Sequence, residues 1–149
     1  MTMTKFETNV YDIADYILRK QGPMSAMKLQ KLVYYAQAWS LAWTDTPLFN
    51  EDIQAWARGP VVPALYYKHK TCFSLSDGFF GGSPDKVSSE QQEVIDVVLQ
   101  FYGNKDPQWL SDLTHLESPW KDARAGLAPD ERGNSVITKE AMLEYYGSL

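Results

Sequence analysis

Histidine, cysteine and carboxylate side chains are the groups that could do chemistry in this sequence, and they fall in two places. His69 and Cys72 stand three residues apart, and His115 stands two residues before Glu117. A zinc site needs about four ligands at matched spacings, and the chain has one cysteine and two histidines. The sequence therefore predicts neither a metal nor a cofactor.

Two catalytic roles are open to these side chains. Cys72 could be a nucleophile whose histidine partner is distant in sequence, because such partners meet only in the folded chain. No flanking signature supports this, and a half-buried cysteine that fills space explains Cys72 as well. Glu117 could form an acid–base pair with His115, or His115 could cap a helix end while Glu117 faces solvent. We favour the structural interpretations and predict a protein that is not an enzyme, with a small hydrolase of unknown substrate as an alternative.

Two arginines carry a further choice between a structural and a binding role. Trp120 and Arg124 lie four residues apart, so indole and guanidinium can meet on one helical turn. The pair could brace a short helix against the core or contact a partner. Arg58 could project from a strand end or form an internal salt bridge, for which the candidate carboxylates are Glu51, Asp52 and Asp112.

The elements that position these groups are organised around residues 28–63. A stripe of apolar and small residues at helical spacing predicts one long, buried central helix; it consists of Leu29, Leu32, Val33, Ala36, Ser40 and Trp43. Five residues are left for a solvated face: Lys28, Gln30, Lys31, Tyr34 and Gln37. The turn residues at 44–47 end this helix, and Leu48 and Phe49 are expected to fold back onto the core.

A short strand follows the turn. Apolar and polar residues alternate from Ile53 to Ala57, which is strand spacing. Gly59-Pro60 is expected to break this strand, and Pro63 suits the first turn of the next helix. We expect the strand to pair with Val136–Ile137. Further helical patterns predict a mainly α fold, a compact single-domain bundle of about six helices with a small two-stranded β element. The domain is placed at 9–149, after a frayed segment at 1–8.

Composition limits the classes of function. The chain has 149 residues and a net charge of −5, which makes a grip on nucleic acid, whose phosphates need a basic face, an unfavoured role. One cysteine and no apolar signal segment or membrane-spanning run predict a cytoplasmic protein with no membrane partner. The 5 Trp and 9 Tyr residues are types that fill cores and also anchor interfaces.

The stretch from Thr71 to Val87 is the least regular part of the sequence. It is rich in glycine around the adjacent Phe79 and Phe80, and long loops inside small domains are often functional or mobile. The two phenylalanines could pack down onto the core or contact a partner.

Several blocks, in order, resemble a known family. They are KLQKLVYYAQAW from Lys28, PLF from Pro47, the I-x-A-W-x-x-GPVVP-x-x-Y run from Ile53, Leu113-Thr114-His115, Pro119-Trp120-Lys121-Asp122-Ala123-Arg124, and Ile137-Thr138. With them the chain resembles the Panacea domain, the SocA-like antitoxin family first met in phage-associated proteins. The resemblance extends from about Leu29 to Tyr146.

The resemblance implies a type II antitoxin that neutralises a cognate protein toxin, encoded by the neighbouring gene, through direct contact. An adaptor that delivers the toxin to a cytosolic protease is an alternative within the family. An acidic antitoxin would suit a toxin with a basic substrate-binding face. No basic recognition helix is present, so we do not expect this chain alone to repress its operon. The predicted partner-binding residues are Trp56, Arg58, Tyr67, Phe79 and Phe80.

Overall fold

The computed structural model describes residues 8–149, and this part of the chain is mainly helical, as predicted. Its seven α-helices are α1 (Val10–Gln21), α2 (Ala26–Thr44), α3 (Pro63–His69), α4 (Ser89–Tyr102), α5 (Pro107–Leu116), α6 (Ser118–Ala123) and α7 (Lys139–Gly147). Of the segment predicted to be frayed, residues 1–7 lie outside the described part. Thr8 is buried, and its hydroxyl donates a hydrogen bond to the side-chain oxygen of Gln91 at 3.0 Å.

The described residues form two small antiparallel sheets, whereas one small two-stranded β element was predicted. Strand β1 (Met24–Ser25) pairs with β4 (Ser74–Leu75), and β2 (Gln54–Trp56) pairs with β3 (Gly59–Val61). The expected contact between the first strand and Val136–Ile137 is confirmed as one isolated bridge, from Gln54 to Val136. It is flanked by backbone hydrogen bonds on either side.

The expectation that Gly59-Pro60 breaks the strand was wrong, because these residues begin the second strand of a hairpin. Trp56 faces Gly59 in the register, so the turn consists of Ala57 and Arg58 alone. Gly59 has a φ of 125°, which a residue without a Cβ adopts at little cost. Pro60 lacks a backbone donor, and a short outer strand tolerates this.

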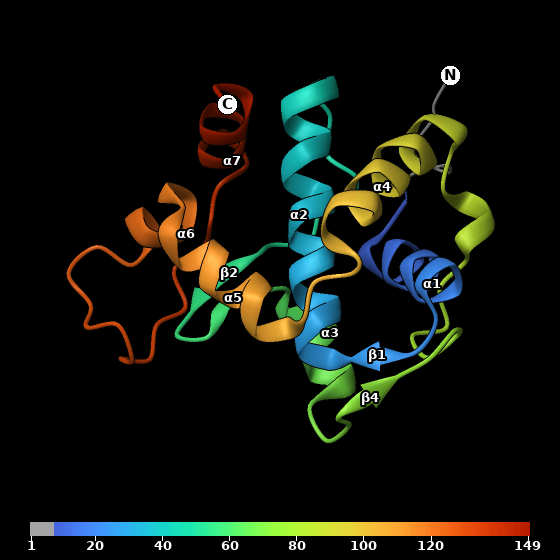
Figure 1. Ribbon diagram of the computed structural model, residues 1–149, viewed down its shortest axis with the longest axis horizontal. Coiled ribbons are helices and arrows are strands. Elements are labelled where there is room, and N and C mark those ends of the chain that lie inside the picture. Colours follow the sequence, from blue (N-terminus) through green and yellow to red (C-terminus); the bar gives the residue numbers. More distant parts are fainter. Residues whose placement is uncertain (1–7) are drawn as a thin grey trace.

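Helix α2 is the centre of the fold, as its apolar stripe predicted. The Ser25 side chain caps its first turn by accepting from the backbone N–H of Lys28 at 3.1 Å, and Asp45 ends it in the left-handed region at φ 57°. The helix contacts α1, α4, α5 and α7. Figure 1 shows it running between α1 and α4 on one side and α5 to α7 on the other.

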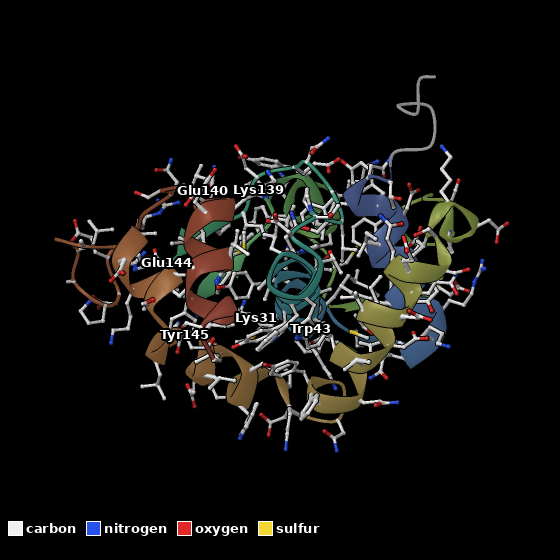
Figure 2. The ribbon with its side chains drawn as sticks, turned by 90° about the horizontal axis from the view of Figure 1, so that it is seen from above. Lys31, Trp43, Lys139, Glu140, Glu144 and Tyr145 are labelled. Atoms are coloured by element: carbon white, nitrogen blue, oxygen red, sulfur yellow. The ribbon has the colours of Figure 1, made fainter. Side chains whose placement is uncertain are left out.

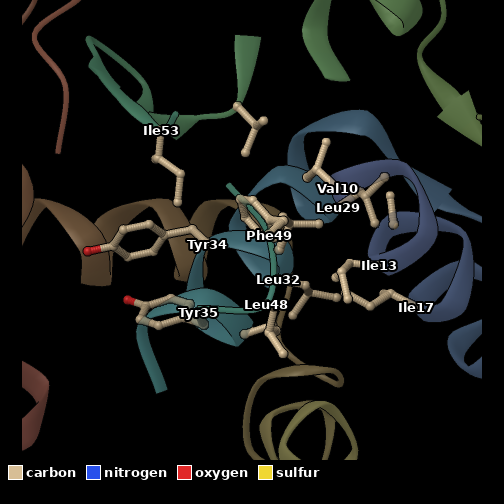
Figure 3. Close-up of a cluster of buried hydrophobic side chains, with 14 of the residues drawn as sticks. Val10, Ile13, Ile17, Leu29, Leu32, Tyr34, Tyr35, Leu48, Phe49 and Ile53 are labelled. Carbon is tan, nitrogen blue, oxygen red and sulfur yellow. The ribbon is translucent and has the colours of Figure 1, made fainter. Parts of the chain in front are cut away.

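The core forms where α1 meets α2. Ile13 and Ile17 of α1 face Leu32 of α2, and Leu48 and Phe49 close the cluster as predicted (Figure 3). All five side chains are buried. Burial of this kind stabilises by roughly 1.5–3 kcal/mol for each large apolar side chain, so the α1–α2 pairing is a main source of stability.

The predicted solvated face of α2 was wrong. Only Lys28 of its five residues is partly accessible, and Gln30, Lys31, Tyr34 and Gln37 are all buried. Neighbouring segments supply their polar partners. Gln37, for example, donates to the carbonyl of Phe49 at 2.9 Å and accepts from the N–H of Leu48 at 2.7 Å. A polar side chain can be buried when its hydrogen bonds are satisfied in this way.

The same helix ends with a tryptophan that was predicted to lie in the core and does not. Trp43 is 49% exposed, whereas Trp39 is partly buried and donates from its indole N–H to the hydroxyl of Tyr102 at 3.0 Å. We expect Trp39→Ala to lower the free energy of unfolding by about 2 kcal/mol, and Trp43→Ala by less than about 1 kcal/mol. Thermal melts of the two variants check this. Equal losses would contradict it.

The irregular stretch between α3 and α4 is attached to α1. The Asp15 carboxylate accepts from the backbone N–H groups of Phe80 at 3.2 Å and Gly82 at 2.7 Å. Asp12 accepts from the N–H of Ser83 at 2.6 Å. Phe80 is thereby held in the core at 5% exposure, while Phe79 remains 36% exposed.

Candidate partner-binding site

A groove of about 910 Å³ opens beside the β2–β3 hairpin. One wall is the start of α2, a second is the hairpin itself, a third is α3, and the loop at 132–134 closes one end. We call it the hairpin groove. A volume of this size is in the range of small-ligand and peptide-side-chain pockets.

Three of the predicted partner-binding residues line this groove, and all three come from the hairpin and α3. The Trp56 ring meets the Tyr66 ring edge to face at 4.9 Å, and Tyr66 meets Tyr67 at 5.8 Å. Trp56 is also fixed by a hydrogen bond from its indole N–H to the Gln54 side chain at 2.8 Å. Tyr67 is 66% exposed, so this wall offers an accessible aromatic surface.

The charges of the groove are all positive. Arg58 at the hairpin turn and Arg132 in the closing loop are exposed, and Lys31 lies in the α2 wall. No aspartate or glutamate is among the lining residues that the structure describes. Within residues 8–149, neither arginine side chain has a hydrogen bond or a salt bridge; the salt bridge considered for Arg58 is therefore not formed.

Lys31 is a buried cation held under the hairpin. Its ammonium donates to the carbonyl of Pro60 at 3.3 Å, and no carboxylate of the described residues lies within salt-bridge distance. Burial lowers the pKa of Lys31 from 10.5 to about 8. A Cβ added to Gly59 would lie 2.5 Å from Lys31 Cε, so the glycine makes room for this side chain.

Lys31→Met should show what this burial costs. The protonated lysine is disfavoured in the folded state, so wild-type stability is lowest below pH 8 and rises as the pH increases from 8 towards 10. Methionine keeps the shape without the charge, and we expect it to raise stability by about 1–2 kcal/mol at pH 7. Urea unfolding at pH 7 and pH 9.5 measures both; a variant with the pH slope of the wild type would refute the assignment.

Phe79 and Phe80, the other predicted partner-binding residues, lie away from the groove lining. The Phe80 ring is buried between Tyr11 at 6.1 Å and His69 at 6.5 Å. Phe79 packs edge to face on Phe80 at 4.9 Å. The loop thus packs one phenylalanine down and leaves the other partly accessible.

His69 and Cys72 are held by different groups. His69 is buried, its Nε2 accepts from the Gln30 side chain at 3.0 Å, and burial lowers its pKa. Cys72 is partly buried against the core. In residues 8–149, no three His, Cys, Asp or Glu side chains are grouped as a metal site.

His115 and Glu117 point to different surroundings, so the acid–base pair considered for them is not formed. The His115 ring stacks on Trp120 at 4.0 Å, and its Nε2 is buried without a partner in the described part of the chain. The alternative that placed Glu117 in solvent was wrong, because it is buried. Its Oε1 accepts from the hydroxyls of Tyr35 and Tyr146, both at 2.7 Å, and burial raises its pKa.

Arg124 braces the short helix α6 against the core, which is one of the two roles predicted from its spacing to Trp120. Its guanidinium lies 5.1 Å from the Trp120 ring centre and is buried. It donates to the carbonyls of Ala55, in β2, and Ala128, in the following loop, both at 3.0 Å. This arginine therefore joins α6, the hairpin and the loop that carries Arg132.

Two of the three basic residues that line the groove, Lys31 and Arg132, were not predicted from the sequence as part of a binding site. Arg132 is far from the hairpin along the chain and sits in a loop with no periodic pattern, so no local signal relates it to Arg58. Lys31 was predicted on a solvated face because its hydrogen-bond partner, the carbonyl of Pro60, is also distant along the chain. The Arg124–Trp120 spacing and the expected pairing of the first strand with Val136–Ile137 were the signals that this region is joined to the hairpin.

A family model described as "Antitoxin SocA-like, Panacea domain" matches residues 29–121, more than half of the chain. The chain belongs to this family. Antitoxin SocA of Caulobacter vibrioides (strain NA1000 / CB15N) is 37% identical to it over 68 residues, which are 43% of the chain and 34% of that relative. The chain thus matches about a third of the length of this SocA protein. No solved structure matches the chain.

The part that matches the SocA-like Panacea family contains most of the groove. Residues 29–121 include nearly all of α2, the hairpin and α3, whereas the loop with Arg132 lies outside the match. Within residues 8–149, no helix combines the length and apolar character that crossing a membrane requires.

Proposed function

We propose that this protein is the antitoxin of a type II toxin–antitoxin pair and neutralises its cognate toxin by direct protein–protein contact in the cytoplasm. Membership of the SocA-like Panacea antitoxin family is the observation that carries the proposal. The aromatic wall of the hairpin groove supports a binding role, because Trp, Tyr and Arg are the residues that most often dominate interfaces.

Exposed aromatic side chains outside the groove could enlarge the contact surface. Three large aromatic side chains are exposed at the ends of helices: Trp43, Phe101 and Trp109. Figure 2 shows Trp43 near the end of α2, on the side of the molecule that also carries Tyr145. A neutralising interface of standard size buries roughly 1,600 Å² in total, which exceeds what the groove alone can offer.

Expression of the neighbouring gene alone and together with this chain tests the proposal. We expect the neighbour to stop growth alone, and co-expression to restore growth and yield a complex that co-purifies. A harmless neighbour, or rescue without any complex, would contradict neutralisation by contact. Toxin levels in cells that lack cytosolic proteases separate contact from delivery: a pure neutraliser leaves the toxin level unchanged in both backgrounds.

A further inference from the structure

We infer that the hairpin groove binds an acidic segment of the toxin, with Arg58 and Arg132 as the contacts to its carboxylates. The inference rests on the proposed function, since the occupant is a part of the cognate partner. It assigns to one surface of this chain a ligand chemistry opposite to that expected from the net charge of the whole molecule.

The first step is the separation of charge. The chain as a whole carries −5, yet the described lining of the groove contains Lys31, Arg58 and Arg132 and no carboxylate. Like charges gathered in a concave site focus a positive potential there, and this raises the local concentration of anions. A surface with this pattern is complementary to an acidic partner segment.

The second step is that both guanidinium groups are free to bind. Neither Arg58 nor Arg132 is hydrogen-bonded or ion-paired within residues 8–149, although the two salt bridges in that range show that other basic side chains do find carboxylates. A guanidinium binds a carboxylate through two parallel N–H donors. Arg58 belongs to the hairpin and Arg132 to the loop at 132–134, so two separate elements each supply one guanidinium to the groove.

The third step is that packing and hydrogen bonds hold the two segments that carry these arginines. Arg58 is at a two-residue turn whose base is fixed by the Trp56–Tyr66 contact and by Lys31 beneath Gly59. The loop of Arg132 is tied to the hairpin by Arg124. The rings of Trp56 and Tyr67, which also line the groove, offer apolar contact for the stems of acidic side chains. The groove volume suits a segment of a few residues.

A nucleic-acid strand fits these observations less well. Phosphate chains are bound over long tracks by many cations, and the affinity scales with the number of phosphates neutralised. The groove supplies two exposed arginines in a chain with 19 acidic and 14 basic residues. A short run of carboxylates needs no more than this, whereas a nucleic-acid backbone continuing past the groove would meet an acidic protein.

Charge reversal in the purified antitoxin–toxin complex tests the inference. The double variant Arg58→Glu/Arg132→Glu is compared with Lys86→Glu/Lys121→Glu, which makes the same change of net charge at two exposed lysines outside the groove lining. We expect the groove variant to weaken binding by about 100-fold or more and the control by about threefold or less. All four positions are exposed, so the fold should persist; circular dichroism melts verify it.

The outcomes separate the two proposals. A groove variant that binds like the wild type, or a control that loses as much affinity, would overturn the inference while the antitoxin function stands. Absence of any complex with the wild-type chain would overturn the proposed function and this inference with it. Weakened binding confined to the groove variant, with an affinity that falls as salt rises, supports both.

Photo-crosslinking identifies the occupant directly. A benzoylphenylalanine placed at Tyr67, whose side chain is 66% exposed in the groove, is compared with one at Leu116, which is 72% exposed on α5 and outside the groove lining. We expect mass spectrometry to find, at position 67 only, a toxin peptide that contains several Asp or Glu residues. A peptide without acidic residues, or a crosslink to nucleic acid, would overturn the inference.

Discussion

Replacing Glu117 with alanine is expected to lower the free energy of unfolding by about 3 kcal/mol. The carboxylate accepts from the hydroxyls of Tyr35 and Tyr146, and the Tyr146 hydroxyl in turn lies 3.0 Å from that of Tyr34. Alanine would leave buried donors without an acceptor and a cavity at the junction of α2, α6 and α7. Urea unfolding measures the loss; a change below about 1 kcal/mol would refute this account.

Glu117→Gln is the matched control, because an amide oxygen can still accept from both tyrosines. The same variant tests how Glu117 contributes to the pH dependence of stability. Burial raises the pKa of Glu117 above its ordinary value of 4.5, so the folded state prefers the protonated acid. Wild-type stability should therefore fall as the pH rises from about 4.5 through the folded pKa, and Glu117→Gln should lack this fall. A glutamine variant with the full acid-range slope would place the titration elsewhere.

Arg124→Ala is expected to cost about 3 kcal/mol as well. The change removes the contact with Trp120 and leaves the buried carbonyl of Ala55 without its donor. It also releases the loop after α6, where the guanidinium binds the carbonyls of Ala128, Pro129 and Glu131. We expect the melting temperature to drop by about 10 °C.

Arg124→Lys separates charge from geometry in this contact. Lysine keeps the positive charge but cannot donate in two directions from one planar group. We expect it to recover less than half of the loss. Full recovery of the stability lost in Arg124→Ala would mean that the positive charge alone holds the loop. It would contradict a role for the several N–H donors of the planar guanidinium.

The features predicted well from the sequence are those that depend on neighbouring residues. Ser25 and Asn9 cap α2 and α1, and residue types of this kind can be recognised in the sequence because a cap is made within one turn. The buried stripe of α2 and the stop before Pro47 are likewise local patterns. Local patterns of this kind predicted about six helices, and the described residues form seven.

The errors arose where distant segments supply a partner. Gln30 and Gln37 look solvated by type, yet backbone groups of residues 48, 49 and 62 satisfy them. The hairpin turn at Ala57–Arg58 lacks the Asn-Gly or Asp-Gly signal that marks such turns, so the sequence indicates a break at Gly59-Pro60 instead of a hairpin. The groove was found only in part, because Arg132 meets it through the tertiary fold.

The lysine lodged beneath Gly59 has a kinetic consequence. Because Lys31 anchors the hairpin to the central helix and Arg124 anchors the closing loop to the hairpin, the walls of the groove are already arranged before any partner arrives. Little conformational entropy then remains to be lost on association. Toxin variants that keep the same charges should accordingly associate at similar rates, and differences in affinity among them should come from the dissociation rate.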